Sequence, residues 1–249
     1  MIPALVAVLG GVLSALAFPR FGPGLLIVPG VSLFLWSLRS SGSRRHGWLL
    51  GFLYGLSFFA GLMWWSIELG WIALIPLAIV LALFPSGFGW WLAGHRDSPP
   101  GVWLVFVVSL WSVMELIRYH FPFSGIEWGA AGYALSDLAI VRTAAAYIGT
   151  SGWTVLIVAL AAALVLMATG YRQTWVWAMV ALPVVVTVVA LGIDWVVPPS
   201  SPLPPVRATI VQGSTPCPYE KCPPDERLGT YRLHLELMSL DGVLVQLNL

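Results

Sequence analysis

Long runs without a single Asp, Glu, Lys or Arg are the feature that most constrains this chain. There are seven, at residues 1–19, 21–38, 47–67, 69–94, 98–114, 143–171 and 173–193. A helix of about 20 apolar residues spans the hydrocarbon core of a bilayer, whereas strands buried in a soluble core run for only about 4–8 residues. Helices also satisfy every backbone polar group locally, as lipid requires. The runs therefore predict membrane-spanning helices.

The composition supports this prediction. Apolar residues make up 59% of the chain and charged residues 9%, against about 45–50% and about 25% in soluble domains. We therefore predict an α-helical integral membrane protein with about seven transmembrane helices. The predicted spans lie near residues 3–18, 24–38, 47–66, 71–94, 101–118, 150–169 and 174–195. The first is expected to be a retained helix, because no basic segment precedes it as in a signal peptide.

The distribution of arginines predicts the orientation of these spans. Short cytoplasmic loops carry an excess of Lys and Arg. A cytoplasmic N-terminus places five arginines inside and three outside, and with seven spans it leaves the C-terminal tail extracytoplasmic. The inside group is Arg39, Arg44, Arg45, Arg96 and Arg172, and the outside group is Arg20, Arg118 and Arg142.

The chain changes character after the last predicted span. Residues 198–205 hold five prolines and are expected to form a stiff linker. Residues 206–212 are rich in β-branched side chains, which favours a strand, and 225–239 have the apolar spacing of an amphipathic helix. A strand followed by a helix is the start of an α/β unit. Residues 206–249 are too few to complete such a domain, which normally needs about 100 residues.

Several functional classes find no support in the sequence. The net charge is +1 and basic residues form no patch, so nucleic acid is not an expected partner. The four histidines lack metal-ligand spacing, and no cofactor motif is present. Cys217 and Cys222 have the spacing C-x4-C rather than the redox C-x-x-C. They are candidates for a local disulfide in an oxidising compartment, although free thiols are the other possibility.

Two features around the fifth span are candidates for function. Glu115 and Arg118 lie three residues apart and share a helix face. Charged residues at membrane depth are usually paired, functional, or both. The alternative to a functional role is a structural ion pair, or snorkelling of these side chains at the membrane interface. The segment 120–133 that follows is rich in aromatic residues, including Trp128 and Tyr133. It could line an entrance for lipid headgroups, or it could be an ordinary interfacial aromatic belt.

Taken in order, these segments resemble the apolipoprotein N-acyltransferases of bacterial lipoprotein maturation. Residues 212–218 (QGSTPCP), with Cys222 following, are similar to actinobacterial members. The likeness extends from residue 1 to about 238. It is carried by 16–22 (LAFPRFG), 51–55 (GFLYG) with Trp64 and Trp65, Trp111 with Glu115 and Arg118, 121–125 (FPFSG) with Trp128 and Tyr133, 148–153 (IGTSGW) and 211–213 (VQG).

The resemblance implies a bacterial plasma-membrane enzyme with an extracytoplasmic nitrilase-like domain. In that family a Cys nucleophile takes an acyl chain from a phospholipid, helped by a Glu base and a Lys that stabilises the oxyanion. The acyl group then passes to the amine of the diacylglyceryl cysteine of an apolipoprotein. This chain departs from the family at residues 241–249 (DGVLVQLNL), where the family's catalytic Glu has no counterpart. The Lys and Cys are absent as well, so no catalytic residue is expected here, and truncation is the explanation we adopt.

The sequence therefore predicts the membrane portion of an apolipoprotein N-acyltransferase, inactive alone. Its expected partners are a phospholipid acyl donor, the diacylglyceryl-modified apolipoprotein and membrane lipids. The residues expected to handle substrate are Glu115, Arg118, Trp128 and Tyr133. An alternative is a catalytically silent scaffold for a partner such as a polyprenol-phosphate mannose synthase, to which some actinobacterial relatives are linked. A small transporter is disfavoured, because no internal repeat or charged pair at the midplane is evident.

Overall fold

A computed structural model of the protein describes residues 2–19, 21–122, 124–196 and 232. Cys217 and Cys222, the linker at 198–205, and the strand and helix expected within 206–249 all lie outside the described residues. The disulfide and the incomplete nitrilase-like domain therefore stay predictions.

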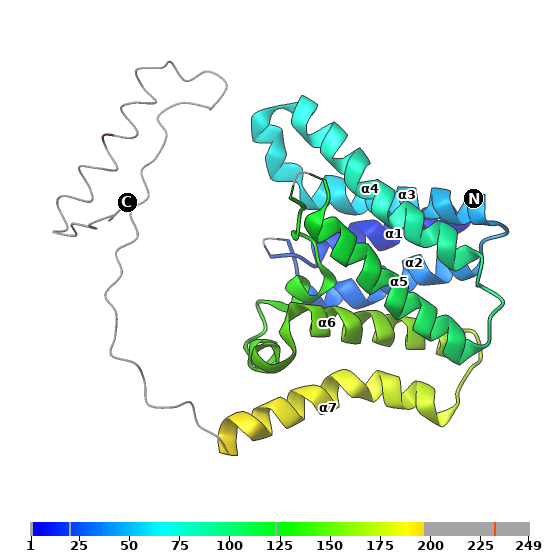
Figure 1. The fold of residues 1–249 in the computed structure, drawn as a ribbon, viewed down its shortest axis with the longest axis vertical. Coiled ribbons are helices and arrows are strands. Elements are labelled where there is room, and N and C mark those ends of the chain that lie inside the picture. The colour runs from blue at the N-terminus through cyan, green and yellow to red at the C-terminus, as the bar shows by residue number, and fades with distance from the viewer. Residues whose placement is uncertain (1, 20, 123, 197–231, 233–249) are drawn as a thin grey trace.

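Seven α-helices pack side by side in the described part of the chain (Figure 1). The connections α2–α3, α4–α5 and α6–α7 lie at one end of this bundle, together with the N-terminus (Figure 1). The connections α1–α2, α3–α4 and α5–α6 lie at the other end, where α7 also finishes. The helices are α1 (Ile2–Leu16), α2 (Ile27–Arg39), α3 (Arg44–Leu62), α4 (Trp71–Ala93), α5 (Pro100–His120), α6 (Ala139–Ala168) and α7 (Thr174–Val196).

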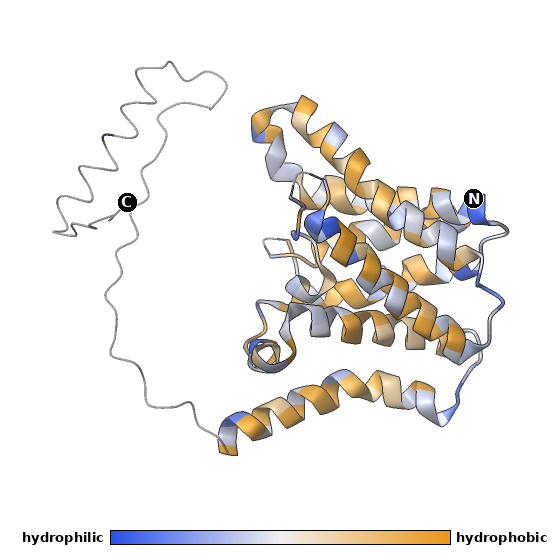
Figure 2. Ribbon diagram, viewed as in Figure 1, coloured by the Kyte–Doolittle hydropathy of each residue, from blue (hydrophilic) through white to orange (hydrophobic). Residues whose placement is uncertain are grey.

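Apolar residues cover most of the helices, and hydrophilic residues gather at the two ends of the bundle (Figure 2). Four helices, α4 to α7, are long and apolar enough to cross a membrane. The helices α1 and α2 are apolar but shorter, and α3 has 19 residues and begins with two arginines. A bundle that exposes so much apolar surface needs lipid around it. The chain is thus a helical membrane protein.

The most extensive helix contact, between α3 and α4, depends on small residues. A Cβ atom added at Gly51 would lie 2.1 Å from the backbone oxygen of Pro85, and one added at Gly47 would lie 2.5 Å from that of Gly89. Together with Gly55, which meets Ala82, these glycines form a stripe at four-residue spacing along α3. In lipid, where no hydrophobic force draws helices together, such stripes let backbones approach closely enough for dispersion to hold them.

The sixth helix is longer than the sequence predicted. The expected span was 150–169, yet α6 starts at Ala139 and its first three turns occupy residues expected to be loop. The helical course breaks at Gly149, which has φ 67° and ψ 179°. A glycine adopts this conformation without the steric penalty that a Cβ atom imposes. The kink separates the part of α6 beside the α5–α6 connection from the part packed in the bundle.

Candidate functional site

The candidate site begins with a buried carboxylate near the end of α5. Glu115 is 5% exposed. Its Oε1 atom accepts hydrogen bonds from Trp111 Nε1 at 3.0 Å and from the backbone N–H of Ala131 at 3.1 Å. Its Oε2 atom accepts from the hydroxyl of Tyr119 at 3.1 Å. The carboxylate thus ties α5 to the start of the short 3₁₀ helix η3 (Ala131–Leu135).

The guanidinium of Arg118 holds the preceding part of the same connection. Arg118 is 2% exposed, and its Nη1 atom donates to the carbonyls of Ile126 at 2.6 Å and Trp128 at 2.7 Å. The backbone N–H of Ile126 returns a bond to the Arg118 carbonyl at 2.9 Å. The guanidinium carbon also lies 5.6 Å from the ring centroid of Phe59 on α3. A charged donor that bonds two carbonyls fixes their relative position.

Glu115 and Arg118 do not form the ion pair that was considered as an alternative. Among the described residues, the one salt bridge joins Arg96 to its sequence neighbour Asp97, at 3.2 Å. Glu115 and Arg118 instead bond to separate points of the α5–α6 connection. Both buried charged side chains therefore fix the backbone of the α5–α6 connection.

The connection reaches these partners through two sharp glycine turns. Gly125 has φ 81° and Gly129 has φ 90°. A Cβ atom at Gly129 would lie 2.6 Å from a methyl group of Leu62, so the turn packs directly on α3. Beyond it, the N–H of Gly132 donates to Thr154 Oγ1 on α6 at 3.0 Å. The connection is thus anchored to α3, α5 and α6.

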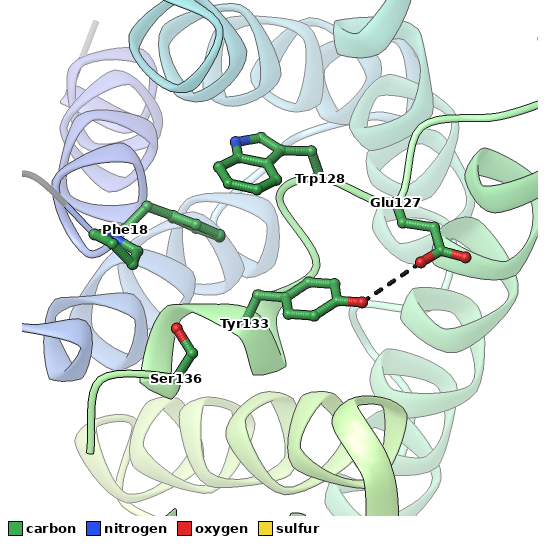
Figure 3. Close-up of a pocket in the computed structure, with 6 residues that line it drawn as sticks. Phe18, Glu127, Trp128, Tyr133 and Ser136 are labelled. Atoms are coloured by element: carbon green, nitrogen blue, oxygen red, sulfur yellow. Dashed lines mark hydrogen bonds between the residues drawn. The ribbon is translucent and has the colours of Figure 1, made fainter. Parts of the chain in front are cut away.

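A cavity of about 300 Å³ opens beside this anchored connection. Trp128 and Tyr133, which are 55% and 38% exposed, line it from one side, and Phe18 lines it from the end of α1 (Figure 3). The Tyr133 hydroxyl donates to Glu127 Oε2 at 3.4 Å, a long hydrogen bond. Pro19 and Ser136 complete the lining. Aromatic walls with a carboxylate and two hydroxyls suit an amphiphile with an apolar body and a polar head.

The structure divides the four predicted site residues into two pairs. Trp128 and Tyr133 line the cavity, whereas Glu115 and Arg118 are buried outside its lining and hold the connection that carries the other two. Sequence reasoning did not select Phe18, Glu127 or Ser136. Of these, Phe18 stands in the segment 16–22 and Glu127 precedes Trp128, so both lay within segments already singled out.

Glu115 also lines a second cavity, of about 390 Å³, between α5 and α6. Tyr119, Ser112, Ser151 and Thr154 contribute its polar groups. The cavity lies beside the Gly149 kink, where α6 changes its course. The connection that Glu115 anchors therefore has open space on two sides, one lined by Trp128 and one between the helices.

No metal centre is evident in the parts of the chain that the structure describes. No group of three or more His, Cys, Asp or Glu side chains that could hold a metal ion occurs there. The cavity beside Trp128 offers a single carboxylate, from Glu127.

The long apolar helices and the anchored, aromatic connection define a multi-helix membrane protein with an aromatic-lined cavity at one end of the bundle. Residues 10–164 match the family model described as the apolipoprotein N-acyltransferase N-terminal domain. This match covers more than half of the chain and includes Glu115, Arg118, Trp128 and Tyr133. The chain belongs to the apolipoprotein N-acyltransferase family.

Individual relatives support the same assignment. The apolipoprotein N-acyltransferase of Nitrosomonas europaea is 28% identical over 225 residues, which cover 85% of this chain and 44% of the relative. That of Rhodopseudomonas palustris is 30% identical over 236 residues, with 86% and 43% covered. That of Chromobacterium violaceum is 32% identical over 147 residues, with 54% and 28% covered. The chain spans less than half the length of these relatives.

Proposed function

We propose that this chain forms the membrane portion of an enzyme that acylates lipoproteins. The full enzyme transfers an acyl chain from a phospholipid to the N-terminal diacylglyceryl cysteine of an apolipoprotein. The observation that carries the proposal is the cavity lined by Phe18, Trp128 and Tyr133, which lies within the family match at residues 10–164. The helix α7 finishes at the same end of the bundle as this cavity (Figure 1).

In this proposal the cavity binds the lipid part of a substrate. The rings of Phe18 and Trp128 contact the acyl chains, and Glu127, Tyr133 and Ser136 contact the polar head. Its volume of about 300 Å³ is at the lower end of typical small-molecule sites. The cavity therefore holds the region where headgroup and chains join, and the rest of the chains extends into the bilayer.

Glu115 and Arg118 act as positioning residues. Neither lines the cavity, and each holds the backbone that carries Trp128 and Tyr133. Because these anchors are buried and bonded, the aromatic rings present a preorganised surface. Preorganisation reduces the entropy that binding would otherwise cost.

The proposed topology has seven passes with a cytoplasmic N-terminus. The described arginines support it, because the end of the bundle where the α2–α3, α4–α5 and α6–α7 connections lie (Figure 1) carries more of them than the other end. The arginines at this end are Arg39, Arg44, Arg45, Arg96 and Arg172, against Arg118 and Arg142 at the cavity end. The cavity then opens at the extracytoplasmic leaflet, where the family's nitrilase-like domain is expected.

The described residues bind substrate in this proposal but do not transfer the acyl group. Residues 2–196 contain no cysteine, so the thioester intermediate that the family resemblance implies requires a nucleophile from elsewhere in the full enzyme. Purified protein of this sequence, incubated with phospholipid and a diacylglyceryl-cysteine peptide, should give no triacylated product by mass spectrometry. Formation of that product would contradict this part of the proposal.

Photo-crosslinking tests the binding site without relying on catalysis. A benzoylphenylalanine placed at position 128 should crosslink a diacylglyceryl-cysteine peptide, and excess unlabelled peptide should compete. The same probe at position 177 is the control, because Trp177 is 52% exposed near the start of α7, at the opposite end of the bundle. Equal crosslinking at both positions, or none that competes at position 128, would overturn the proposed site.

A further inference from the structure

The end of the bundle opposite the Trp128 cavity carries a cluster of arginine and aromatic side chains. Arg39 ends α2, and its guanidinium carbon lies 4.8 Å from the ring centroid of Trp103 on α5 and 5.6 Å from that of Tyr171, which follows α6. Arg96, before α5, donates from Nη1 to the backbone carbonyl of Ser41. Three connections therefore meet around Arg39.

Three buried polar atoms in this cluster have no hydrogen-bond partner among the residues that the structure describes. They are Nη1 of Arg39, Oγ of Ser41 and Nε1 of Trp103. Ser41 is 2% exposed and Trp103 is fully buried. All three groups can donate a hydrogen bond, and two of them can do nothing else. A buried donor without an acceptor is costly, and each such group in a native protein needs an explanation, of which a bound water or ion is one.

The cluster has an excess of positive charge and a shortage of acceptors. Among the described residues, Arg39 has no carboxylate within salt-bridge distance, and the Asp97 that pairs with Arg96 has a side chain 88% exposed. Arg44 makes a cation–π contact with Trp90, whose ring centroid lies 4.8 Å from the guanidinium carbon of Arg44. The Arg39 side chain as a whole is only partly buried, so a ligand can reach it from the end of the bundle. A cationic site whose buried donors lack acceptors is expected to bind an anion.

We propose that Arg39, with Ser41 and Trp103, binds a phosphate group at this membrane surface. The cluster lies where helices end, which is the depth of lipid headgroups, and basic pockets between membrane helices bind anionic headgroups. An arginine fork bonds two phosphate oxygens at once, and a phosphate diester offers acceptors for the Ser41 hydroxyl and the Trp103 indole N–H as well. A phosphate group thus offers the acceptors that these three donors lack.

Thermal unfolding in nanodiscs tests the proposal. The protein is placed in discs of phosphatidylcholine alone, in discs of phosphatidylcholine and phosphatidylglycerol at 1:1, and in phosphatidylcholine discs with added inorganic phosphate. Either the anionic lipid or the phosphate should raise Tm by several degrees over phosphatidylcholine alone. A rise with lipid only assigns the site to a headgroup, and an equal rise with inorganic phosphate assigns it to a soluble phosphate. No rise in either arm overturns the proposal.

Matched variants distinguish anion binding at this specific site from a general effect of surface charge. Arg39→Gln should lose most of the rise in Tm, whereas Arg45→Gln should keep it, because Arg45 is an exposed arginine in the first turn of α3, at the same end of the bundle. Ser41→Ala should unfold at the same or a higher temperature in phosphatidylcholine, since it removes a stranded hydroxyl, yet it should gain less from the anion. The assignment would be overturned if Arg39→Gln and Arg45→Gln lost the anion-induced rise in Tm equally. It would also be overturned if the rise stayed undiminished in both Arg39→Gln and Ser41→Ala.

Discussion

Glu115 and Arg118 stand one helical turn apart on α5, carry opposite charges, and form no ion pair with one another. Glu115 Oε1 accepts from the N–H of Ala131 at 3.1 Å, and Arg118 Nη1 donates to the carbonyl of Trp128 at 2.7 Å. The two charges therefore hold backbone points only three residues apart in one connection. A backbone fixed at both points carries its side chains in a defined place, which is what a preorganised binding surface needs.

Removing the Glu115 carboxylate should loosen this connection. In Glu115→Leu the Trp111 indole N–H and the Ala131 N–H lose their acceptor while both stay buried. Each stranded donor costs about 1–3 kcal/mol of unfolding free energy. Thermal unfolding in detergent should therefore show a clear fall in Tm.

Glu115→Gln provides the control for charge. Its amide oxygen can keep both bonds that Oε1 accepts, so its loss should be nearer 1 kcal/mol. The expected order of Tm is wild type, then Glu115→Gln, then Glu115→Leu. If Glu115→Gln falls as far as Glu115→Leu, the negative charge matters more than the hydrogen bonds, and the anchoring role assigned to Oε1 is wrong.

Arg118→Lys should free residues 124–130 while preserving the charge. Both the Ile126 and Trp128 carbonyls accept from Nη1, whose two N–H bonds are fixed in the guanidinium plane, whereas a lysine ammonium is a rotating donor on a flexible stem and fixes neither direction. Proteinase K should then cut this segment about ten times faster, as mass spectrometry of the fragments will show. Arg142→Lys is the matched control, since Arg142 makes an exposed bond to the Ser136 carbonyl and should leave the cleavage rate unchanged. Equal rates for Arg118→Lys and wild type would exclude this anchor.

The helices could be predicted from the sequence because lipid makes the signal strong. Charge-free runs of adequate length leave few alternatives to a helix, and each of the seven α-helices overlaps one of the predicted ranges. The start of α6 is not predicted, because Arg142 interrupts the charge-free run and so indicates a loop. In the structure Arg142 lies within α6, and its side chain donates a hydrogen bond to the backbone carbonyl of Ser136 in the connection. A single charge near a membrane surface does not end a helix when its side chain can reach a partner.

The candidate site could be predicted only in part. The segment with Trp128 and Tyr133 stood out by its aromatic density, and it does line a cavity. The opposite wall comes from Phe18, more than 100 residues earlier. No local sequence pattern predicts that residues so far apart in the chain will line the same cavity. The roles of Glu115 and Arg118 were equally hidden, because their partners are backbone atoms, which every residue possesses. Side-chain chemistry in the sequence identifies charges but does not say which amide or carbonyl they will meet.

Gly51→Val should destabilise the contact between α3 and α4. A Cβ atom at Gly51 would lie 2.1 Å from the Pro85 backbone oxygen, which is not free to move aside as a flexible side chain would be. Overpacking of this kind costs about 1–3 kcal/mol and more where backbone must shift. Gly87→Ala is the control, because an added Cβ there meets nothing within 4 Å. Fluorescence-detected size exclusion should show reduced Tm for Gly51→Val alone, and equal behaviour of the two variants would refute the close contact.

Trp128→Ala should weaken substrate binding in the full-length enzyme without unfolding it. The ring is 55% exposed and contributes little to the core, yet it forms a wall of the cavity. Losing a large aromatic contact with a lipid chain is worth roughly 1–2 kcal/mol, or about tenfold in affinity. KM for the diacylglyceryl-cysteine peptide should rise by about this factor with kcat little changed, the pattern of a lost binding contact.

Tyr133→Phe isolates the hydroxyl in the same assay. Its bond to Glu127 is 3.4 Å long and exposed, so removing it should alter KM by less than about twofold, because a long, solvated bond contributes little. The ring itself, which lines the cavity beside Trp128, is retained. A larger effect from Tyr133→Phe than from Trp128→Ala would mean that the polar rim, rather than the aromatic wall, dominates binding. An unchanged KM in both variants would place the lipid outside this cavity.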